Sequence, residues 1–364
     1  MTHPDPALEP TQTLPATMRA ASRFAYGSAA QIEVAVVDRP EPGPGEVLVK
    51  VAAAGLDRAT LHLLEGKPYV ARLALGVRRP RRSILGQQVA GVVAAVGAGV
   101  SSFAVGDRVF GTAAGSFAEY AVAKASTLAR TPAGISDAAA ATFGVSGLTA
   151  HEAVHRGRVR SGQQVLVLGA SGAVGTYAVQ LAAVSGAHVT GVCSARETRL
   201  RAEPGCRARA STTGRPRCQT WVRPFDLIID IAGNRRLRDL RLALSPAGAL
   251  VIVGGEGGGP FLGGIHRNLI AGVTNPFTKQ RLEWFVSTPT TRQVRRVRRS
   301  RGRAFHSNPG RPAGGPGGAA GRRRGDAARR PPRPRDRAAL TLGQDHLGPA
   351  PRWSVMRSGT CPMG

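Results

Sequence analysis

The sequence has few aromatic residues, no long apolar run and no apparent leader. Aromatic side chains make up 5% of the 364 residues, whereas 42% are hydrophobic, so a sizeable core can still be buried. No run of about 18 or more apolar residues occurs, which excludes a membrane-spanning helix. The first seventeen residues lack a basic start and an apolar core, so they are not a secretory signal. We expect two domains after a flexible extension over 1–17, a cytoplasmic location and no membrane partner.

Cysteine is scarce and is not arranged for metal binding. The four cysteines form no C-x-x-C pair, and none has a histidine at zinc-finger spacing. The sequence therefore predicts no metal site and free thiols in a reducing compartment. The four are Cys193, Cys206, Cys218 and Cys361.

Acidic residues are few, and the net charge of +28 is concentrated in two windows. Residues 291–364 hold 18 Arg, no Lys and 3 Asp, a balance of +15. Residues 196–223 hold 8 Arg and 2 Glu, a balance of +6. Hydrophobic periodicity is lost in 198–222 and again after about Thr291.

Three interpretations of these windows remain open. The tail can be a disordered basic segment that binds nucleic acid, because Arg contacts phosphate and Pro and Gly prevent a packed core. It can be an inert extension. Both windows can instead be translated out of frame, since a shifted frame in GC-rich DNA yields mostly Arg, Pro, Gly and Ala. We favour the frame error, because 198–222 interrupts a domain where a fold should continue.

A strand, a glycine-rich turn and a helix follow one another in the middle of the chain. The apolar run from Gln164 to Gly169 is typical of a buried parallel strand, and a helical pattern and a second strand, His188–Cys193, come after the turn. Such a unit binds a dinucleotide pyrophosphate at the amino end of its helix. The turn residues predicted to bind the cofactor are Gly169, Ala170, Ser171, Gly172, Ala173, Val174 and Gly175.

The end of the second strand favours NADP(H) over NAD(H). An Asp or Glu there would bind the ribose 2′-hydroxyl, but this chain has Ser194 and Arg196, which can bind a 2′-phosphate. Two further strands are expected at Phe225–Gly233 and Ala249–Gly255. Gly254 ends the last of these and is a candidate nicotinamide contact.

The preceding residues, 18–150, read as a β-rich domain that ends in a helix. Together with the glycine turn, several of its segments resemble the medium-chain dehydrogenase/reductase superfamily, in its zinc-independent quinone-oxidoreductase branch. The resemblance covers about 18–196 and 225–287. The segments that carry it are PGPGEVLVKV, GDRVFG, GSFAEYAV, SGLTAHEAV, VLVLGASGAVGTYAVQLA and FDLIIDIAG.

The resemblance implies an α/β fold with a GroES-like β-rich catalytic domain, 18–150, and a doubly wound Rossmann domain, 151–290. Residues 291–364 then form a disordered tail. It also implies dimers and hydride transfer from NADPH to a quinone or an α,β-unsaturated carbonyl. Zinc is not expected, because Gly55 and Leu56 stand where zinc-dependent members have Cys, and Gln87 stands where they have His.

The resemblance also suggests contacts to substrate or nicotinamide from Tyr26, Asp57 and Thr149, whereas no catalytic acid is assigned. The chain departs from its branch in having Asp57 near a usual Asn and Gln88 near a usual Asp. Its ending does not match the family either. The alternatives are an inactive, frame-disrupted member and a basic-tailed protein that binds nucleic acid.

Overall fold

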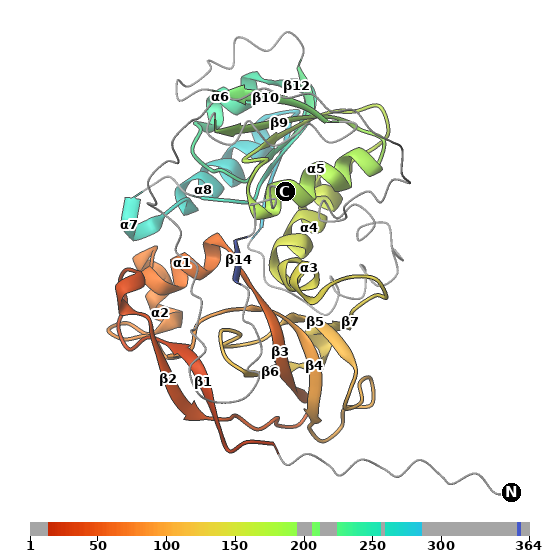
Figure 1. Ribbon diagram of the computed structural model, residues 1–364. Helices are drawn as coiled ribbons and strands as arrows, with labels where there is room; N and C mark the ends of the chain where they lie inside the picture. The colour runs from red at the N-terminus through yellow and green to blue at the C-terminus, as the bar shows by residue number, and fades with distance from the viewer. Residues whose placement is uncertain (1–13, 195–205, 212–223, 256–258, 286–354, 358–364) are drawn as a thin grey trace, which may run out of the picture.

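The computed structural model describes residues 14–194, 206–211, 224–255, 259–285 and 355–357. In this part of the chain a body of mostly antiparallel strands is joined through helices to a parallel sheet with helices on its faces (Figure 1). This arrangement confirms the α/β fold with a GroES-like β-rich part and a Rossmann-like sheet. Most of 291–364, most of 198–222 and the first thirteen residues lie outside the described residues.

The β-rich body contains a two-stranded and a six-stranded sheet among the described residues. Its central strand is β3, which pairs with both β4 and β6. Val47 and Val49 pack into one core cluster and Leu48 into another, because successive side chains point to opposite faces of a strand. The strands are β1 (Thr17–Ser22), β2 (Glu33–Asp38), β3 (Glu46–Leu56), β4 (Gln88–Val96), β5 (Arg108–Thr112), β6 (Tyr120–Lys124), β7 (Leu128–Arg130) and β14 (Val355–Arg357).

Short helices lie at the top of this body, toward the parallel sheet (Figure 1). Asp57 caps the first of them, and Ser136 caps α3, since each side chain accepts a backbone N–H of the first turn. A π-helical turn carries the chain from α3 directly into α4 and so joins the two bodies. The helical segments are α1 (Arg58–Glu65), η2 (Tyr69–Ala71), α2 (Arg72–Leu75), α3 (Asp137–Thr142), η4 (Phe143–Gly147) and α4 (Leu148–Gly157).

The parallel sheet has the order β10-β9-β8-β11-β12-β13 among the described residues. The predicted apolar runs form its buried central strands, because helices cover both faces of such a sheet. Its strands are β8 (Gln164–Leu168), β9 (His188–Ser194), β10 (Cys206–Ser211), β11 (Phe225–Asp230), β12 (Leu244–Ile252) and β13 (Arg281–Trp284). Its helices are α5 (Ala173–Val184), α6 (Leu237–Leu242), α7 (Gly259–Leu262) and α8 (Ile265–Thr274).

Two short strands lie in the two arginine-rich windows. β10 lies inside 198–222 and pairs in parallel with β9. Its sequence, CRARAS, alternates Arg with small residues, so six residues of that window do have the two-residue period of a strand. β14 lies inside the predicted disordered tail and pairs in parallel with β3 at Ala54–Leu56. The pairing uses backbone groups, which composition does not report.

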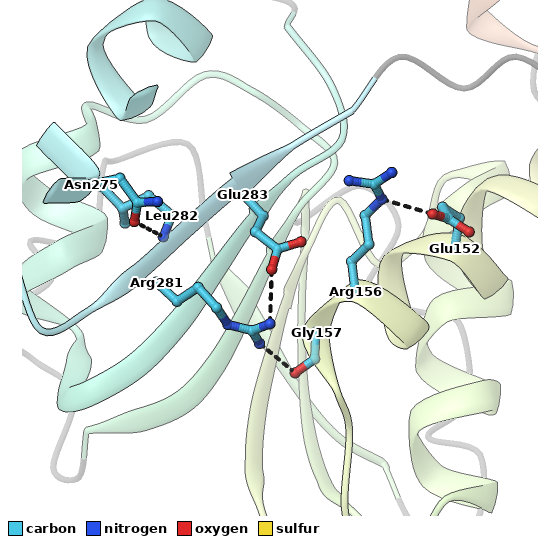
Figure 2. Close-up of polar contacts among 7 residues, drawn as sticks. All are labelled: Glu152, Arg156, Gly157, Asn275, Arg281, Leu282 and Glu283. Atoms are coloured by element: carbon cyan, nitrogen blue, oxygen red, sulfur yellow. Dashed lines mark hydrogen bonds and ion pairs between the residues drawn. The ribbon is translucent and has the colours of Figure 1, made fainter. Parts of the chain in front are cut away.

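The outer strand β13 is tied to α4, far away in the sequence. Arg281 donates to the carbonyl of Gly157 at 3.2 Å and pairs with Glu283 at 2.8 Å (Figure 2). A cation at the carbonyl end of a helix also interacts favourably with the helix dipole. On the other side of the strand, Asn275 accepts the N–H of Leu282 at 2.9 Å (Figure 2). These contacts set the position of β13 against the helix that joins the two bodies.

Candidate functional site

The carboxyl ends of three neighbouring strands meet at one edge of the parallel sheet. In the register of β8, β11 and β12, Leu168 lies opposite Asp230, and Asp230 lies opposite Ile252. The glycine turn begins at Gly169, and Gly254 follows β12 by two residues, so both lie at this edge. Open α/β sheets bind ligands outside the carboxyl ends of their strands. The structure thus brings the two predicted glycine segments together.

The turn from β8 into α5 has the shape that a pyrophosphate site needs. Gly169 has a φ of 86°, which favours glycine, and its N–H donates to the carbonyl of Val192 at 2.9 Å. A Cβ on Gly175 would lie 2.0 Å from the Gly169 carbonyl oxygen, so α5 approaches the strand end more closely than any other residue would allow. A Cβ on Gly172 would meet only that oxygen, at 3.3 Å. The space in front of Gly172 is therefore open on the side where a phosphate would approach.

The helix that follows supplies donors rather than a cap. Gly172 is the N-cap of α5 and has no side chain to bind the first-turn N–H groups. Ala173 and Val174 open the helix, and N–H groups of a first turn have no carbonyl partner within the helix. An anion placed there accepts hydrogen bonds from these N–H groups and interacts favourably with the positive end of the helix dipole. The residues present fit a dinucleotide pyrophosphate.

Asp230 organises the neighbouring strand end. Its carboxylate is fully buried, accepts the N–H of Gly233 at 3.0 Å, and pairs with Arg267 of α8 at 2.5 Å. Its backbone carbonyl accepts the N–H groups of Val253 and Gly254 at 2.9 and 3.2 Å. One residue thus connects the turn after β11, the turn after β12 and helix α8. Sequence reasoning missed this role, although a carboxylate that ends an apolar strand was a usable signal.

The α7–α8 turn touches both the sheet edge and the β-rich body. A Cβ on Gly255 would lie 2.7 Å from Cα of Gly264, and one on Gly263 would lie 3.3 Å from the Pro68 ring. Next to this contact, the rings of Tyr69 in η2 and Phe261 in α7 meet edge to face, with centroids 5.2 Å apart. The two bodies therefore touch beside the carboxyl edge of the sheet; we call this contact the domain junction.

A second joint connects the bodies through α5. The hydroxyl groups of Tyr177 and Thr142 form a hydrogen bond of 2.8 Å, and the Tyr177 ring packs edge to face on Phe143 at 5.3 Å. Burial raises the pKa of Tyr177, and the bond to Thr142 offsets only part of that rise. The Tyr177 phenol is therefore a neutral packing group near the amino end of α5, the helix that follows the glycine turn.

Asp57 and Gln88 form a buried polar pair under α1. The Gln88 amide donates to Asp57 Oδ2 at 3.1 Å, while its oxygen accepts the N–H groups of Val145 and Ser146 at 2.9 and 3.2 Å. The other Asp57 oxygen accepts both the N–H and the hydroxyl of Thr60, each at 2.9 Å. Asp57 is thus placed in a network between the β-rich sheet and the π-helical turn. Its predicted contact with a substrate stays a prediction.

The other two predicted contacts are also engaged within the protein. Tyr26 donates its hydroxyl to the Gly76 carbonyl at 2.7 Å, and the Arg72 guanidinium lies 4.4 Å from its ring centroid. Thr149, buried on α4, donates to the Val145 carbonyl at 2.7 Å. Neither hydroxyl proton is available to a ligand in this arrangement, so their role at the nicotinamide stays a prediction.

The residues predicted to select the cofactor are only partly described. Ser194 is the last residue of β9 and lies at the same sheet edge as Gly169. Arg196 lies outside the described residues. Within the described ranges, no group of three or more His, Cys, Asp or Glu side chains is placed to hold a metal ion. None of the helices described there is long and apolar enough to cross a membrane.

Comparisons with known proteins agree with this geometry. Residues 43–133 match the family model of the alcohol dehydrogenase GroES-like domain. The quinone oxidoreductase of Rattus norvegicus is 32% identical over 251 residues, which cover 66% of this chain and 74% of the rat protein.

Two solved structures show the same fold. That of the quinone oxidoreductase from Coxiella burnetii has a TM-score of 0.64 at 23% identity, covering 77% of this chain and 86% of its own. A mycobacterial protein complexed with NADPH also has a TM-score of 0.64, at 24% identity, covering 80% of this chain and 88% of its own.

Proposed function

Because the chain belongs to the quinone-oxidoreductase family of medium-chain dehydrogenases/reductases, we propose that it is an NADPH-dependent oxidoreductase that reduces quinones or α,β-unsaturated carbonyl compounds without zinc. The observation that carries the proposal is the turn from Gly169 to Gly175, with its close backbone approach and the open space before Gly172. NADPH, when bound, supplies the hydride. The protein has to bind, orient and shield the reacting groups.

Each part of the carboxyl edge has a task in this proposal. The N–H groups of Ala173 and Val174 bind the pyrophosphate. Ser194, which ends β9, and Arg196, which follows it, bind the 2′-phosphate. A Cβ on Gly254 would lie 1.8 Å from the carbonyl oxygen of Ile231, so only glycine lets the turn after β12 pack against the end of β11. The turn held in this way is the part of the edge that would contact the nicotinamide. The complex with NADPH in a mycobacterial protein of the same fold supports the choice of cofactor.

The proposal leaves zinc out on the chemistry of the residues present. Gly55 has no side chain, and Gln87, at the position where zinc-dependent members have His, carries an amide. Neither position offers a thiolate or an imidazole, the ligands that zinc prefers. Reduction then depends on positioning and on proton donation from solvent. A homodimer remains part of the proposal on the family resemblance alone.

A pair of substitutions at Gly172 tests the cofactor site. Gly172→Asp places a carboxylate where the phosphates approach, and we expect saturable NADPH binding, followed by nicotinamide fluorescence, to be lost. Gly172→Ala adds only a methyl group, 3.3 Å from the Gly169 carbonyl oxygen and at a φ of −74°, so a small shift accommodates it and we expect near-normal binding. Absence of a fluorescence change with the unmodified full chain would overturn the proposal and leave the inactive, frame-disrupted member as the better description.

A second experiment tests the preference for NADPH over NADH. Arg196→Glu puts a negative charge where a 2′-phosphate would lie, so we expect NADPH affinity to fall at least about tenfold while NADH affinity changes little. Glu197→Gln next to it, which removes a negative charge, serves as the control for general electrostatics. Equal weakening of both cofactors by Arg196→Glu would contradict the assignment.

A further inference from the structure

A loop beside the domain junction exposes aliphatic and basic side chains together. Leu73 on α2 and Val77 just after it are 71% and 63% exposed. The four arginines that follow within six residues of Gly76 are exposed as well. We call this set the basic loop; it comprises Leu73, Val77, Arg78, Arg79, Arg81 and Arg82.

The basic loop is held in shape by its backbone. Gly76 begins it with a φ of 115°, and its N–H and carbonyl bind the carbonyl of Arg72 at 2.8 Å and the hydroxyl of Tyr26 at 2.7 Å. The N–H of Arg81 donates to the Leu75 carbonyl at 2.8 Å, which closes the loop. The loop is therefore a fixed surface feature.

Phe24 extends the apolar part of this surface. Its ring is 62% exposed. The preceding residue, Arg23, donates its N–H to the carbonyl of Ser83 at the far end of the basic loop, at 2.9 Å. An exposed aromatic side chain thus follows a residue that is hydrogen-bonded to the end of the basic loop.

The charge of the basic loop is not neutralised by the described residues. No acidic residue occurs between Glu65 and Asp107, and in the described ranges none of the four arginines has an acidic partner. The nearest carboxylate in sequence, Glu65, pairs with Lys67 at 3.3 Å. Four positive charges and at least two aliphatic side chains thus face solvent together.

The basic loop adjoins the place where substrate would be handled. α2 continues directly from η2, whose Tyr69 meets Phe261 at the domain junction. The α7–α8 turn in turn lies against Pro68 at Gly263 and against Gly255 of the carboxyl edge at Gly264. Figure 1 shows α2 and α7 on the same side of the molecule, one on each body.

We propose that the basic loop, with Phe24, docks peripherally on an anionic phospholipid bilayer, so that apolar quinones can be taken from the lipid phase near the domain junction. The part that concerns the quinone rests on the proposed function; the docking does not. Arginines bind lipid phosphates, while Leu73, Val77 and Phe24 enter the interface. On a nucleic acid the two aliphatic side chains would stay in water, which favours the bilayer. We predicted no membrane partner from the lack of a spanning segment, and a peripheral surface needs none.

Vesicle binding by the full chain tests the docking. The probes are vesicles of phosphatidylcholine alone and of phosphatidylcholine with phosphatidylserine, and the measurement is co-sedimentation. We expect binding only to the anionic vesicles. Replacing all four loop arginines by Gln should weaken it by at least about tenfold, because each basic residue near an anionic surface adds to the attraction. Leu73→Ser with Val77→Ser should weaken it severalfold with no change of charge.

A matched variant separates the basic loop from the basic tail. Replacing Arg322, Arg323, Arg324 and Arg329 by Gln removes the same charge from 291–364 and should leave more vesicle binding than the loop variant does. Equal losses in the two variants would overturn the proposal. An unchanged affinity for anionic vesicles in the Leu73→Ser with Val77→Ser variant would also overturn it. So would binding of single-stranded RNA that is lost in the loop variant when vesicle binding is not lost.

Two further readouts separate this proposal from the function. All loop variants should keep NADPH fluorescence, which shows that they fold; Gly172→Asp should keep vesicle binding. With a long-chain quinone in anionic vesicles, the loop variants should raise KM severalfold and leave kcat unchanged, whereas KM for a water-soluble benzoquinone should not move. An unchanged KM for the vesicle-borne quinone would overturn the quinone part while the docking could still stand.

Discussion

The carboxylate of Asp230 and the guanidinium of Arg267 form an ion pair of 2.5 Å whose side chains are 0% and 6% exposed. The pair joins the end of β11 to α8, two elements that meet at the carboxyl edge of the sheet. Two further nitrogen atoms of Arg267, Nε and Nη1, are buried without a partner among the described residues. Because a buried charge is costly unless it is paired, Asp230 is the group that makes Arg267 tolerable in this place.

Asp230→Asn should therefore strongly destabilise the protein. It leaves the Arg267 charge buried and uncompensated, which costs about 3–5 kcal/mol in comparable cases. Urea unfolding measures the change. The control is Glu65→Gln, which removes an ion pair that is nearly half exposed and should cost less than about 1 kcal/mol. Similar losses of unfolding free energy for the two variants would show that the buried ion pair contributes no more to stability than the exposed one.

The Asp57–Gln88 pair predicts a rescue between two substitutions. Gln88→Glu retains an acceptor for Val145 and Ser146 but sets a second carboxylate against Asp57, so unfolding free energy should fall. Adding Asp57→Asn to the same chain places an amide N–H opposite the new carboxylate at position 88, so that a donor again faces an acceptor. We expect the double variant to be more stable than the sum of the single effects by about 1–3 kcal/mol, measured as a double-mutant cycle. Additive effects would contradict the shared hydrogen bond.

Gly175 should be far more sensitive than Gly172 to one added methyl group. At Gly175 the new Cβ would lie 2.0 Å from the Gly169 carbonyl oxygen, so α5 must move away from the strand end. We expect a loss of about 1–3 kcal/mol, as for other overpacked sites, and weaker NADPH binding. Gly172→Ala would place its Cβ 3.3 Å from the same oxygen, which needs a much smaller shift, and should change both quantities far less. Thermal unfolding with and without NADPH measures both; equal responses would argue against the close approach.

Tyr177 predicts a loss of stability at alkaline pH. Burial raises its pKa in the folded state, whereas the unfolded phenol titrates near pH 10. The unfolded state therefore releases its proton first, and stability falls as pH rises from about 10 through the folded pKa. Tyr177→Phe should reduce that decline and cost about 1 kcal/mol at pH 7 for the lost bond to Thr142. Urea unfolding between pH 7 and 11 measures both. An unchanged alkaline slope would mean that Tyr177 does not titrate on unfolding.

Local pattern was enough to locate the nucleotide turn and most strands. The spacing of Gly169, Gly172 and Gly175 between an apolar run and a helical segment predicted β8, the turn and α5, because each depends on neighbours within a few residues. The sequence did not predict β10, although arginine and small residues alternate along it. A six-residue alternation is too short to stand out in a window that is rich in arginine throughout.

Everything that joins distant segments was decided by tertiary structure. Asp230 and Arg267 are 37 residues apart, and Asp57 and Gln88 are 31 apart, so no local periodicity links either pair. Tyr69 and Phe261 meet only because the two bodies pack beside the sheet edge. The sequence alone determined most of the segments that become strands, turns and helices, β10 and β14 excepted, since backbone preference and apolar spacing are local. Which buried charge meets which partner was decided by packing, because pairing depends on where the chain returns in space.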